Sequence, residues 1–254
     1  MKPIRGTQIN RTHLHARSLV CGWVMNEGSG LYLHDLSGSA NHGTLTNMTA
    51  ADWVAGENGV ELDFDGSNDH IRAASVSGFS ITASWTMLSR IYFDSRSANT
   101  PFTGFSGSSD EGIGLGVTSD DELKVFSPGE TPGEGSILSD HTYYDVGLVW
   151  DGTKFYAYLD GIEDYNVQPT GSDWQNWTWL DIGYRDIGGT DQYFDGQVVY
   201  CYLYQERLSD AVIKDIAERP YQMFEHEDFP AWLYVEAAAG GLSIPVAMHH
   251  YLRH

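Results

Sequence analysis

The segment from residue 19 to residue 71 constrains the fold more than any other part of the chain. It contains two stretches in which apolar residues occupy every second position, a period that predicts β-strands with one buried face. The stretches are joined by NEGSG, DLSG and similar runs, whose residue types are those of tight turns. We therefore predict antiparallel β-structure, with residues 60–76 forming a hairpin. The apolar positions are Leu19, Cys21, Trp23 and Met25, followed by Val60, Leu62 and Phe64.

The second half of the chain repeats this pattern. Asp151-Gly152 separates two apolar runs and predicts a hairpin with a two-residue turn, and Asp160-Gly161 predicts the next turn. Further strands are expected at 79–87 and around 113–117. Ser209 is placed to cap a short helix, and Pro220 should stop it.

Taken together, these motifs resemble a known family. The order of NEGSG, NHGTL, KFYAYLDGIED (154–164), LDIGYRD (180–186), FDGQVVYCYLY (194–204) and RLSDAVIKDI (207–216) is similar to that of laminin-G-like domains in the concanavalin A-like jelly-roll group. The resemblance implies an all-β, two-sheet antiparallel β-sandwich (a jelly roll) with one short C-terminal helix. The domains expected are an N-terminal arm (1–18), the laminin-G-like domain (19–219) and an extended C-terminal arm (220–254).

Charge and hydropathy exclude two classes of partner. The chain carries 14 Lys and Arg against 35 Asp and Glu, a net charge of −21, so a nucleic-acid backbone would be repelled. No run of about 20 apolar residues predicts a membrane span, and the first 20 residues lack the apolar core of a secretory signal. We expect a protein made in the bacterial cytoplasm, without nucleic acid or membrane as partner.

The two cysteines, Cys21 and Cys201, form neither a disulfide framework nor a zinc site, because no second Cys or His stands at ligand spacing. The resemblance places their strands in one sheet, so two interpretations stay open. They are either buried free thiols of a reducing compartment or a disulfide.

A tryptophan-rich segment is the main candidate for a contact surface. Strand alternation puts Leu180 and Ile182 inside, so Trp179 and Asp181 should point outward, with Trp177 on the same face if the strand begins that early. Sugars stack on exposed aromatic rings, and protein partners use the same rings as anchors. The alternative is that these rings pack within the protein. The candidates for carbohydrate or partner binding are Trp174, Trp177, Trp179 and Tyr184.

Catalysis is not expected. Related glucanases carry Glu-x-Asp-x-x-Glu on one strand, whereas Glu61-Leu62-Asp63 lacks the third acid here. His42 falls in the family's Asn-His-Gly, where a structural hydrogen bond is expected, and His249-His250 has no zinc-protease context. We predict a non-enzymatic protein.

No cofactor is required, but calcium is an alternative. Asp63, Asp65, Asn68 and Asp69 cluster without the spacing of an EF-hand, and turn chemistry explains them. If a metal is bound, the family's rim positions imply Asp35 and Asp195 as its ligands.

The terminal arms suggest assembly. The first 18 residues hold Lys2, Arg5, Arg11 and Arg17, so this basic arm should lie on its own acidic body or on an acidic neighbour, unless it is disordered. Residues 220–254 are too apolar for a disordered tail, and the PYQMF run resembles the segment after such domains in phage and prophage proteins. The candidate assembly residues are Tyr221, Phe224, Phe229 and Trp232.

These features predict two alternative functions. The first is a structural or attachment component of a phage virion, a capsid decoration or tail-associated protein that contacts other virion proteins and copies of itself as a homo-oligomer. The second is a lectin-like carbohydrate-binding module for host surface glycans, with or without calcium. The first places the protein in the virion.

Overall fold

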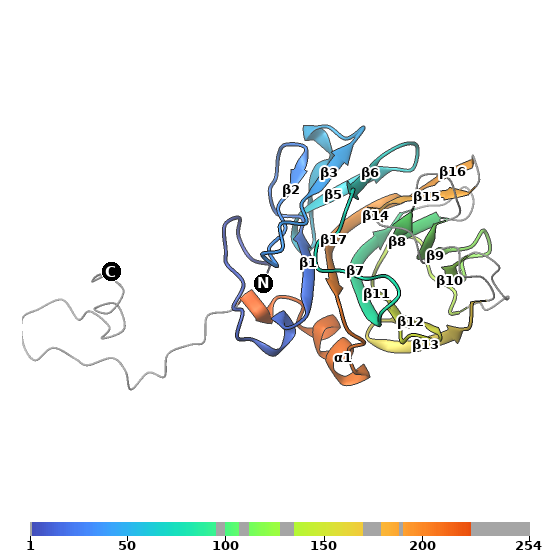
Figure 1. The fold of residues 1–254 in the computed structure, drawn as a ribbon. Helices are drawn as coiled ribbons and strands as arrows, with labels where there is room; N and C mark the ends of the chain where they lie inside the picture. Colours follow the sequence, from blue (N-terminus) through green and yellow to red (C-terminus); the bar gives the residue numbers. More distant parts are fainter. Residues whose placement is uncertain are drawn as a thin grey trace, which may run out of the picture. The chain divides into compact units, whose positions relative to one another are not determined.

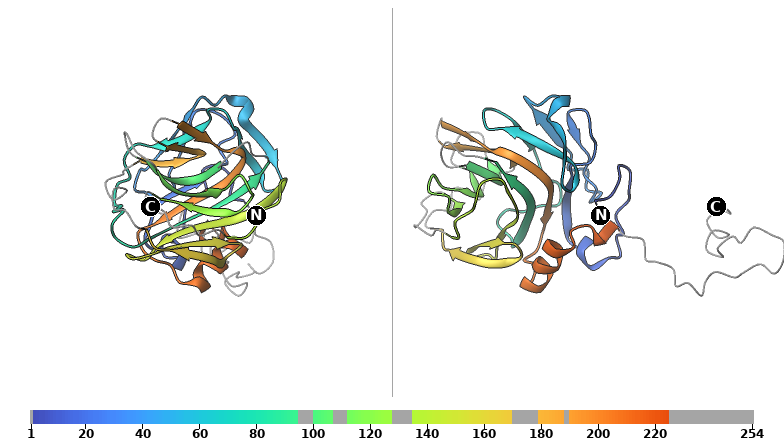
Figure 2. Two further views of the ribbon diagram at one scale, coloured as in Figure 1. Left: turned by 90° about the vertical axis from the view of Figure 1, so that its right-hand side faces the viewer. Right: turned by 180° about the vertical axis from the view of Figure 1, so that it is seen from behind.

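Two antiparallel sheets pack face to face in a computed structural model that describes residues 2–94, 100–106, 112–127, 135–169, 179–187 and 190–224 (Figures 1 and 2). The first sheet has the order β13 (Ile162–Val167), β12 (Phe155–Leu159), β11 (Thr142–Trp150), β7 (Trp85–Phe93), β17 (Asp195–Tyr204), β5 (Gly59–Asp65) and β4 (Trp53–Gly56). β1 (Leu19–Val24) also pairs with β17.

The second sheet has the order β10 (Leu123–Phe126), β9 (Ile113–Val117), β8 (Thr100–Ser106), β14 (Trp179–Ile182), β6 (His70–Ala73), β3 (Gly43–Thr46) and β2 (Tyr32–Leu33). β15 (Tyr184–Ile187) and β16 (Thr190–Tyr193) form a separate hairpin. The helical elements are η1 (Leu14–Ala16), η2 (Ala50–Asp52), α1 (Asp210–Glu218) and η4 (Gln222–Phe224). The predicted all-β sandwich with one short helix is confirmed.

The first strand differs from its prediction in being buried on both faces. Cys21, Trp23 and Met25 belong to the core between the sheets, as the two-residue period predicted. Leu19 and Val24 belong to a second apolar cluster instead. The sequence pattern could not show this, because the cover on the second face comes from distant parts of the chain.

The second apolar cluster lies on the outer face of the first sheet. The helix α1, which contributes to it, lies below β17 and β1 in Figure 1. The centre of the cluster is the row Tyr200, Tyr202 and Tyr204, which alternate along β17 and are fully buried. Side chains of α1 and η4 cover this row, and Ile9 and Ala16 of the N-terminal arm pack against it. The covering residues are Leu208, Ile213, Ile216, Met223 and Phe224.

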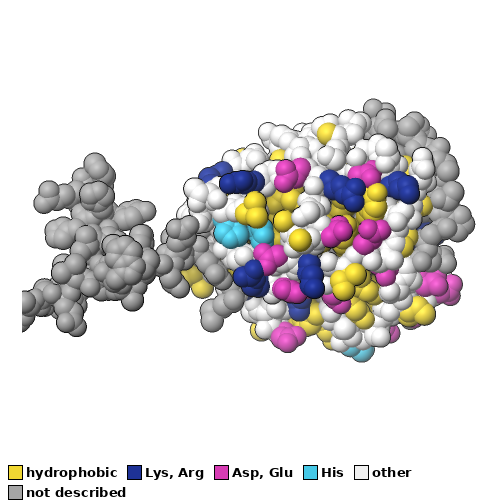
Figure 3. Space-filling view, turned by 90° about the horizontal axis from the view of Figure 1, so that it is seen from below, with side chains coloured by type: hydrophobic (Ala, Val, Ile, Leu, Met, Phe, Trp, Pro, Cys, Tyr) yellow, Lys and Arg dark blue, Asp and Glu magenta, His cyan; other side chains and the backbone are white. Residues whose placement is uncertain are grey.

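The N-terminal arm lies on its own body. The Asn10 amide donates to the Met223 carbonyl at 2.7 Å, and the Asn26 side chain donates to the Pro3 carbonyl at 2.8 Å. The buried His15 imidazole lies 3.1 Å from Asp215 of α1. Lys, Arg, Asp and Glu side chains are interspersed on the face of the molecule seen from below (Figure 3), so the large net charge does not make this face uniformly acidic.

Residues 60–76 do not form the predicted hairpin. β5 pairs with β4 and β17 in the first sheet, whereas β6 pairs with β3 and β14 in the second. The turn between them therefore crosses from one sheet to the other. Asp65 stabilises it by accepting the Ser67 amide at 2.8 Å, and Gly66 has a φ of +70°. Turn residues alone do not reveal whether two strands pair or change sheet.

The hairpins of the second half are confirmed with one difference. Asp160 and Gly161 both have positive φ, as a two-residue turn requires. At the preceding turn Trp150 pairs with Phe155, so four residues connect the strands instead of two. Gly152 has a positive φ there, whereas Asp151 does not. The Asp151 carboxylate accepts from the amides two and three residues on, which closes this longer loop.

Three smaller predictions have mixed outcomes. The strand expected at 79–87 begins only at Trp85, because the chain turns at 80–83 with the Ala83 amide donating to the Ser80 carbonyl. The strand around 113–117 is confirmed as β9. α1 ends before Pro220 as predicted, but the Ser209 side chain makes no capping hydrogen bond.

Cys21 and Cys201 are buried free thiols on the paired strands β1 and β17, where Trp23 stands opposite Cys201. β17 is thus the partner that closes the sheet beside the first strand. In the described part of the chain, no helix is long and apolar enough to cross a membrane.

Protonation of His15 should loosen the arm. Burial lowers the pKa of His15 below its ordinary 6.5, and this outweighs the attraction of Asp215. The unfolded chain then binds the proton more readily, so the free energy of unfolding should fall as pH drops below about 6.5. The free energy of unfolding, measured with urea at pH 7.5 and at pH 5.5, should fall more between these pH values for the natural chain than for His15→Gln.

The matched control is His141→Gln, because the His141 side chain is 69% exposed. This variant should keep the pH dependence of the natural chain. Equal pH dependence in the natural chain and in His15→Gln would show that the arm is not held by a neutral His15.

Candidate functional site

An ion pair lies on the outer face of the second sheet, where β6 and β14 run side by side. Arg72 and Asp181 stand directly opposite each other in the register of these strands. The Arg72 Nε lies 2.6 Å from Asp181 Oδ1 and its Nη2 lies 3.3 Å from Oδ2, so both carboxylate oxygens are engaged. Ser106 of β8 also donates its hydroxyl to Asp181.

Asp181 is 0% exposed, although strand alternation predicted that its side chain points outward. The alternation itself is right, because its neighbours Leu180 and Ile182 enter the core between the sheets. Burial raises the pKa of Asp181, and the hydrogen bonds from Arg72 and Ser106 oppose this rise. Burial would lower the pKa of Arg72, but Asp181 more than compensates and raises it. The guanidinium is therefore a fixed positive charge.

The Arg72 guanidinium lies over two aromatic rings. Its Cζ is 4.4 Å from the centroid of the Trp179 ring and 5.2 Å from that of Tyr184. These distances are typical of cation–π contacts. Trp179, Tyr184 and Arg72 are each partly exposed, so all three side chains contribute to the surface at this point.

Two further rings extend this group. The centroid of the Tyr184 ring lies 5.1 Å from that of His70 and 5.4 Å from that of Tyr193, which stands opposite it in the β15–β16 hairpin. The hydroxyls of Tyr184 and Tyr193 lie 2.9 and 3.3 Å from the two oxygens of Asp191. Burial lowers the pKa of His70, so its ring is neutral at pH 7. The Arg72 platform comprises His70, Arg72, Trp179, Tyr184, Asp191 and Tyr193.

The structure brings together Trp179 and Tyr184, two of the four predicted contact residues, on either side of Arg72. Trp174 and Trp177 lie outside the described residues. Sequence reasoning missed Arg72, because its partner Asp181 is 109 positions away and only the register of β6 and β14 joins them. A lone Arg after a turn gives no signal of this kind.

The sequence profile of the concanavalin A-like lectin/glucanases superfamily matches residues 65–214, more than half of the chain. The chain belongs to this family. The match includes β6, β14 and the β15–β16 hairpin, which together hold the whole Arg72 platform. No curated protein matches the sequence.

Solved structures with this concanavalin A-like fold resemble the chain at low sequence identity. A Trypanosoma rangeli sialidase in complex with the inhibitor DANA has a TM-score of 0.64 at 16% identity, over 81% of this chain and 33% of the sialidase. Domain 4 of AbnA, a GH43 extracellular arabinanase from Geobacillus stearothermophilus in complex with arabinotriose, has a TM-score of 0.61 at 16% identity. That match covers 79% of this chain and 98% of the domain.

The binding domain of Paraclostridial Mosquitocidal Protein 1 is similar as well, with a TM-score of 0.60 at 11% identity over 82% of this chain and 53% of that one. The chain therefore spans about a third of the sialidase and about half of the mosquitocidal chain. At these identities the likeness shows the fold.

The two candidate calcium ligands of this concanavalin A-like chain lie apart. Asp35 is buried beside β1 and accepts hydrogen bonds from the Gly22, Ser37 and Asn41 amides, each at 2.9 Å. Asp195 stands opposite Asp65 at the other end of β17. Within the described ranges, no three His, Cys, Asp or Glu side chains are grouped as a metal site. A calcium ion at Asp35 or Asp195 stays a prediction.

The residues considered for catalysis have structural partners. The buried Glu61 accepts from the Asn58 amide at 2.9 Å and from the Tyr143 hydroxyl at 2.8 Å. His42 accepts the Asp35 amide at 3.1 Å, which confirms the structural hydrogen bond expected for it. His249 and His250 lie outside the described residues.

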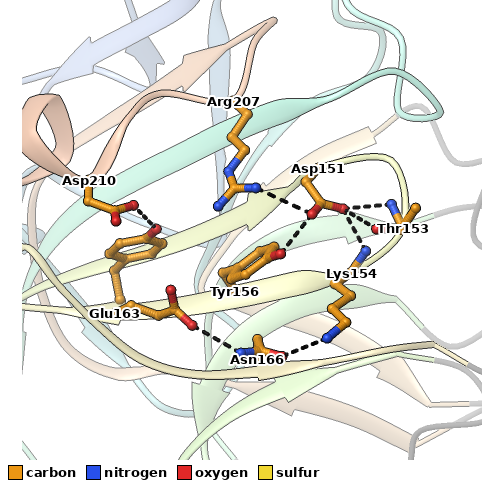
Figure 4. Close-up of polar contacts among 9 residues, drawn as sticks. Asp151, Thr153, Lys154, Tyr156, Glu163, Asn166, Arg207 and Asp210 are labelled. Atoms are coloured by element: carbon orange, nitrogen blue, oxygen red, sulfur yellow. Dashed lines mark hydrogen bonds and ion pairs between the residues drawn. The ribbon is translucent and has the colours of Figure 1, made fainter.

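A second polar cluster lies on the first sheet, around Asp151 (Figure 4). Its carboxylate accepts from Thr153, the Lys154 amide, Tyr156 and Arg207. Although desolvation acts to raise it, these hydrogen bonds hold the pKa of Asp151 well below its usual value. Because this carboxylate is surrounded by donors, we assign the cluster to closing the β11–β12 loop rather than to a ligand.

Removal of Arg72 should destabilise the fold through Asp181. Arg72→Met leaves a buried carboxylate with Ser106 as its remaining donor, and loss of one partner of a buried pair costs about 3 kcal/mol in the free energy of unfolding. Burial raises the pKa of Asp181, so the loss should shrink as pH falls and the carboxyl becomes neutral. Urea unfolding at pH 7.5 and 5 measures both effects.

Arg207→Met is the matched control, because the Arg207–Asp151 pair has its arginine 39% exposed. An exposed pair contributes less than about 1 kcal/mol. An equal decrease in the free energy of unfolding for Arg72→Met and Arg207→Met would contradict the assignment of Arg72 and Asp181 as a buried ion pair.

Proposed function

We propose that this chain is a carbohydrate-binding module that holds a sugar on the Arg72 platform. The observation that supports this best is the Arg72 guanidinium, fixed by Asp181 over the partly exposed rings of Trp179 and Tyr184. Aromatic rings bury the apolar C–H faces of a sugar, while N–H and O–H groups at their edges bond its hydroxyls. The platform offers both kinds of contact side by side.

The platform is also held in place before any ligand arrives. Asp181 holds Arg72, and Asp191 holds the hydroxyls of Tyr184 and Tyr193. A site whose side chains are already ordered loses less conformational entropy on binding. The similar arabinanase domain was solved in complex with arabinotriose, which adds support for a saccharide as the ligand class.

We further propose that the module does not catalyse a reaction. A glycosidase needs one carboxylic acid that donates a proton and a second carboxylate as base or nucleophile. At the platform, Asp181 is bound by Arg72 and Ser106, and Asp191 lies beside two tyrosine hydroxyls. Each carboxylate thus holds another side chain of the platform in place, which supports a binding role and not a catalytic one.

Attachment in a phage particle stays a prediction. Of the residues proposed for assembly, Tyr221 and Phe224 are buried in the second apolar cluster, and Phe229 and Trp232 lie outside the described residues. A module that binds surface glycans is compatible with such a particle, as a homo-oligomer or as one copy among other virion proteins.

Loss of the platform rings should weaken binding. On a glycan array the natural chain should bind a defined set of saccharides, and Trp179→Ala and Tyr184→Ala should each weaken the best hit at least about fivefold by calorimetry, since stacking on one aromatic ring contributes on the order of 1–3 kcal/mol. Tyr32→Ala is the matched control, because Tyr32 lies on the same sheet and is 54% exposed. It should bind normally.

Failure of the natural chain to bind any glycan would overturn the proposal. So would a hit whose affinity is unchanged in both platform variants while their unfolding curves stay normal.

A further inference from the structure

A groove separates the N-terminal arm from the loops that come after β1. Its volume is about 340 Å³, and it is lined on one side by residues 5–9 and 11 of the arm. On the other side are residues 26–27, 34–36, 38 and 42. This arm groove shares no residue with the Arg72 platform. Volumes of roughly 300–1,000 Å³ are typical of small-molecule sites.

Two guanidinium groups enter the arm groove without a partner. Neither the Arg5 nor the Arg11 side chain has an ion pair or hydrogen bond among the described residues. Arg11 lies against Gly38, which has a φ of +88°, at a position where any β-carbon would clash with the guanidinium. The glycine thus leaves room for Arg11 to face the groove. Both residues are exposed, so their guanidinium groups are accessible to a ligand in the groove.

The carboxylates of the arm groove are already occupied. Glu27 accepts the His34 amide at 2.8 Å and the Asn26 amide at 3.2 Å. Asp35 accepts three backbone amides and the Ser37 hydroxyl. Amide donors around a carboxylate offset its negative charge locally. The charged side chains of the groove that have no hydrogen-bond partner among the described residues are therefore those of Arg5 and Arg11.

His42 adds such a donor. Its Nδ1 accepts the Asp35 amide, so in the neutral ring the proton lies on Nε2. His42 lines the arm groove and its side chain is exposed. Arg5, Arg11 and the His42 Nε2–H together form a set of donors suited to an oxyanion.

We propose that the arm groove binds a small ligand of about monosaccharide size through a carboxylate or phosphate group held by Arg5 and Arg11. The planar guanidinium matches both oxyanions with paired hydrogen bonds. A long polyanion is disfavoured, because the net charge of −21 repels it beyond the roughly 8 Å over which the two arginines act at physiological salt.

The test is isothermal titration of the full chain with D-glucuronate, inorganic phosphate and D-glucose. At least one of the two anions should bind, glucose should bind at least tenfold more weakly or not at all, and 0.5 M NaCl should weaken the anion at least fivefold. Arg5→Gln and Arg11→Gln should each reduce anion affinity at least fivefold. Glucuronate binding would identify a carboxylate ligand and phosphate binding a phosphate ligand.

Arg17→Gln is the matched control, because it removes the same charge from the same arm at a position that does not line the groove. It should leave anion affinity unchanged. Failure of both anions to bind, glucose binding of equal strength, or an equal loss in Arg17→Gln would overturn the proposal. Trp179→Ala should not change anion affinity, so this test is independent of the Arg72 platform.

Discussion

The burial of β17 on both faces is the constraint on which the rest of the structure depends. Its inner side chains Val198, Cys201 and Leu203 belong to the core between the sheets. Its outer tyrosines are also buried, and two of their three hydroxyls have partners, whereas the Tyr204 hydroxyl has no hydrogen-bond partner in the described part of the chain. Tyr200 donates to Asp145 at 2.7 Å and Tyr202 to the Pro220 carbonyl at 3.1 Å. The cover comes from α1, η4 and the N-terminal arm.

Because β17 is covered on its outer side, the outer faces of the two sheets differ in their side chains. On the outer face of the first sheet the N-terminal arm, α1 and η4 cover β17, and the arm groove arises where the arm crosses the loops after β1. The outer face of the second sheet has polar and aromatic side chains instead, with the Arg72–Asp181 pair holding them in place. The outer face of the second sheet is the one that we propose for carbohydrate.

The sequence predicted the local elements better than their partners. The period of two from Cys21 to Met25 and the turn at Asp160-Gly161 depend on neighbouring residues, and both are confirmed, whereas Leu19 lies in the second apolar cluster. Such patterns do not determine long-range pairing. The turn after Asp65 gives the same signal whether it joins two paired strands or crosses between sheets, and it crosses.

The same limit applies to the candidate site. The aromatic content of residues 174–184 pointed to a contact surface, and Trp179 and Tyr184 do lie together. Arg72 could not be predicted, because its role comes from the register of β6 against β14. Asp181 was predicted to point outward, but the pattern could not show that it is buried there beside a cation from that distant strand.

The central claim is that a sugar binds on the open face of the second sheet and not on the covered face of the first. The most direct measurement is a ¹H–¹⁵N NMR titration of the full chain with the best hit from a glycan array. The account predicts the largest shifts at the Trp179 indole N–H, the Arg72 Nε–H and the amides of β14–β16, with the resonances of the arm and α1 unchanged. Shifts centred on α1, the arm or the Asp151 cluster would contradict it.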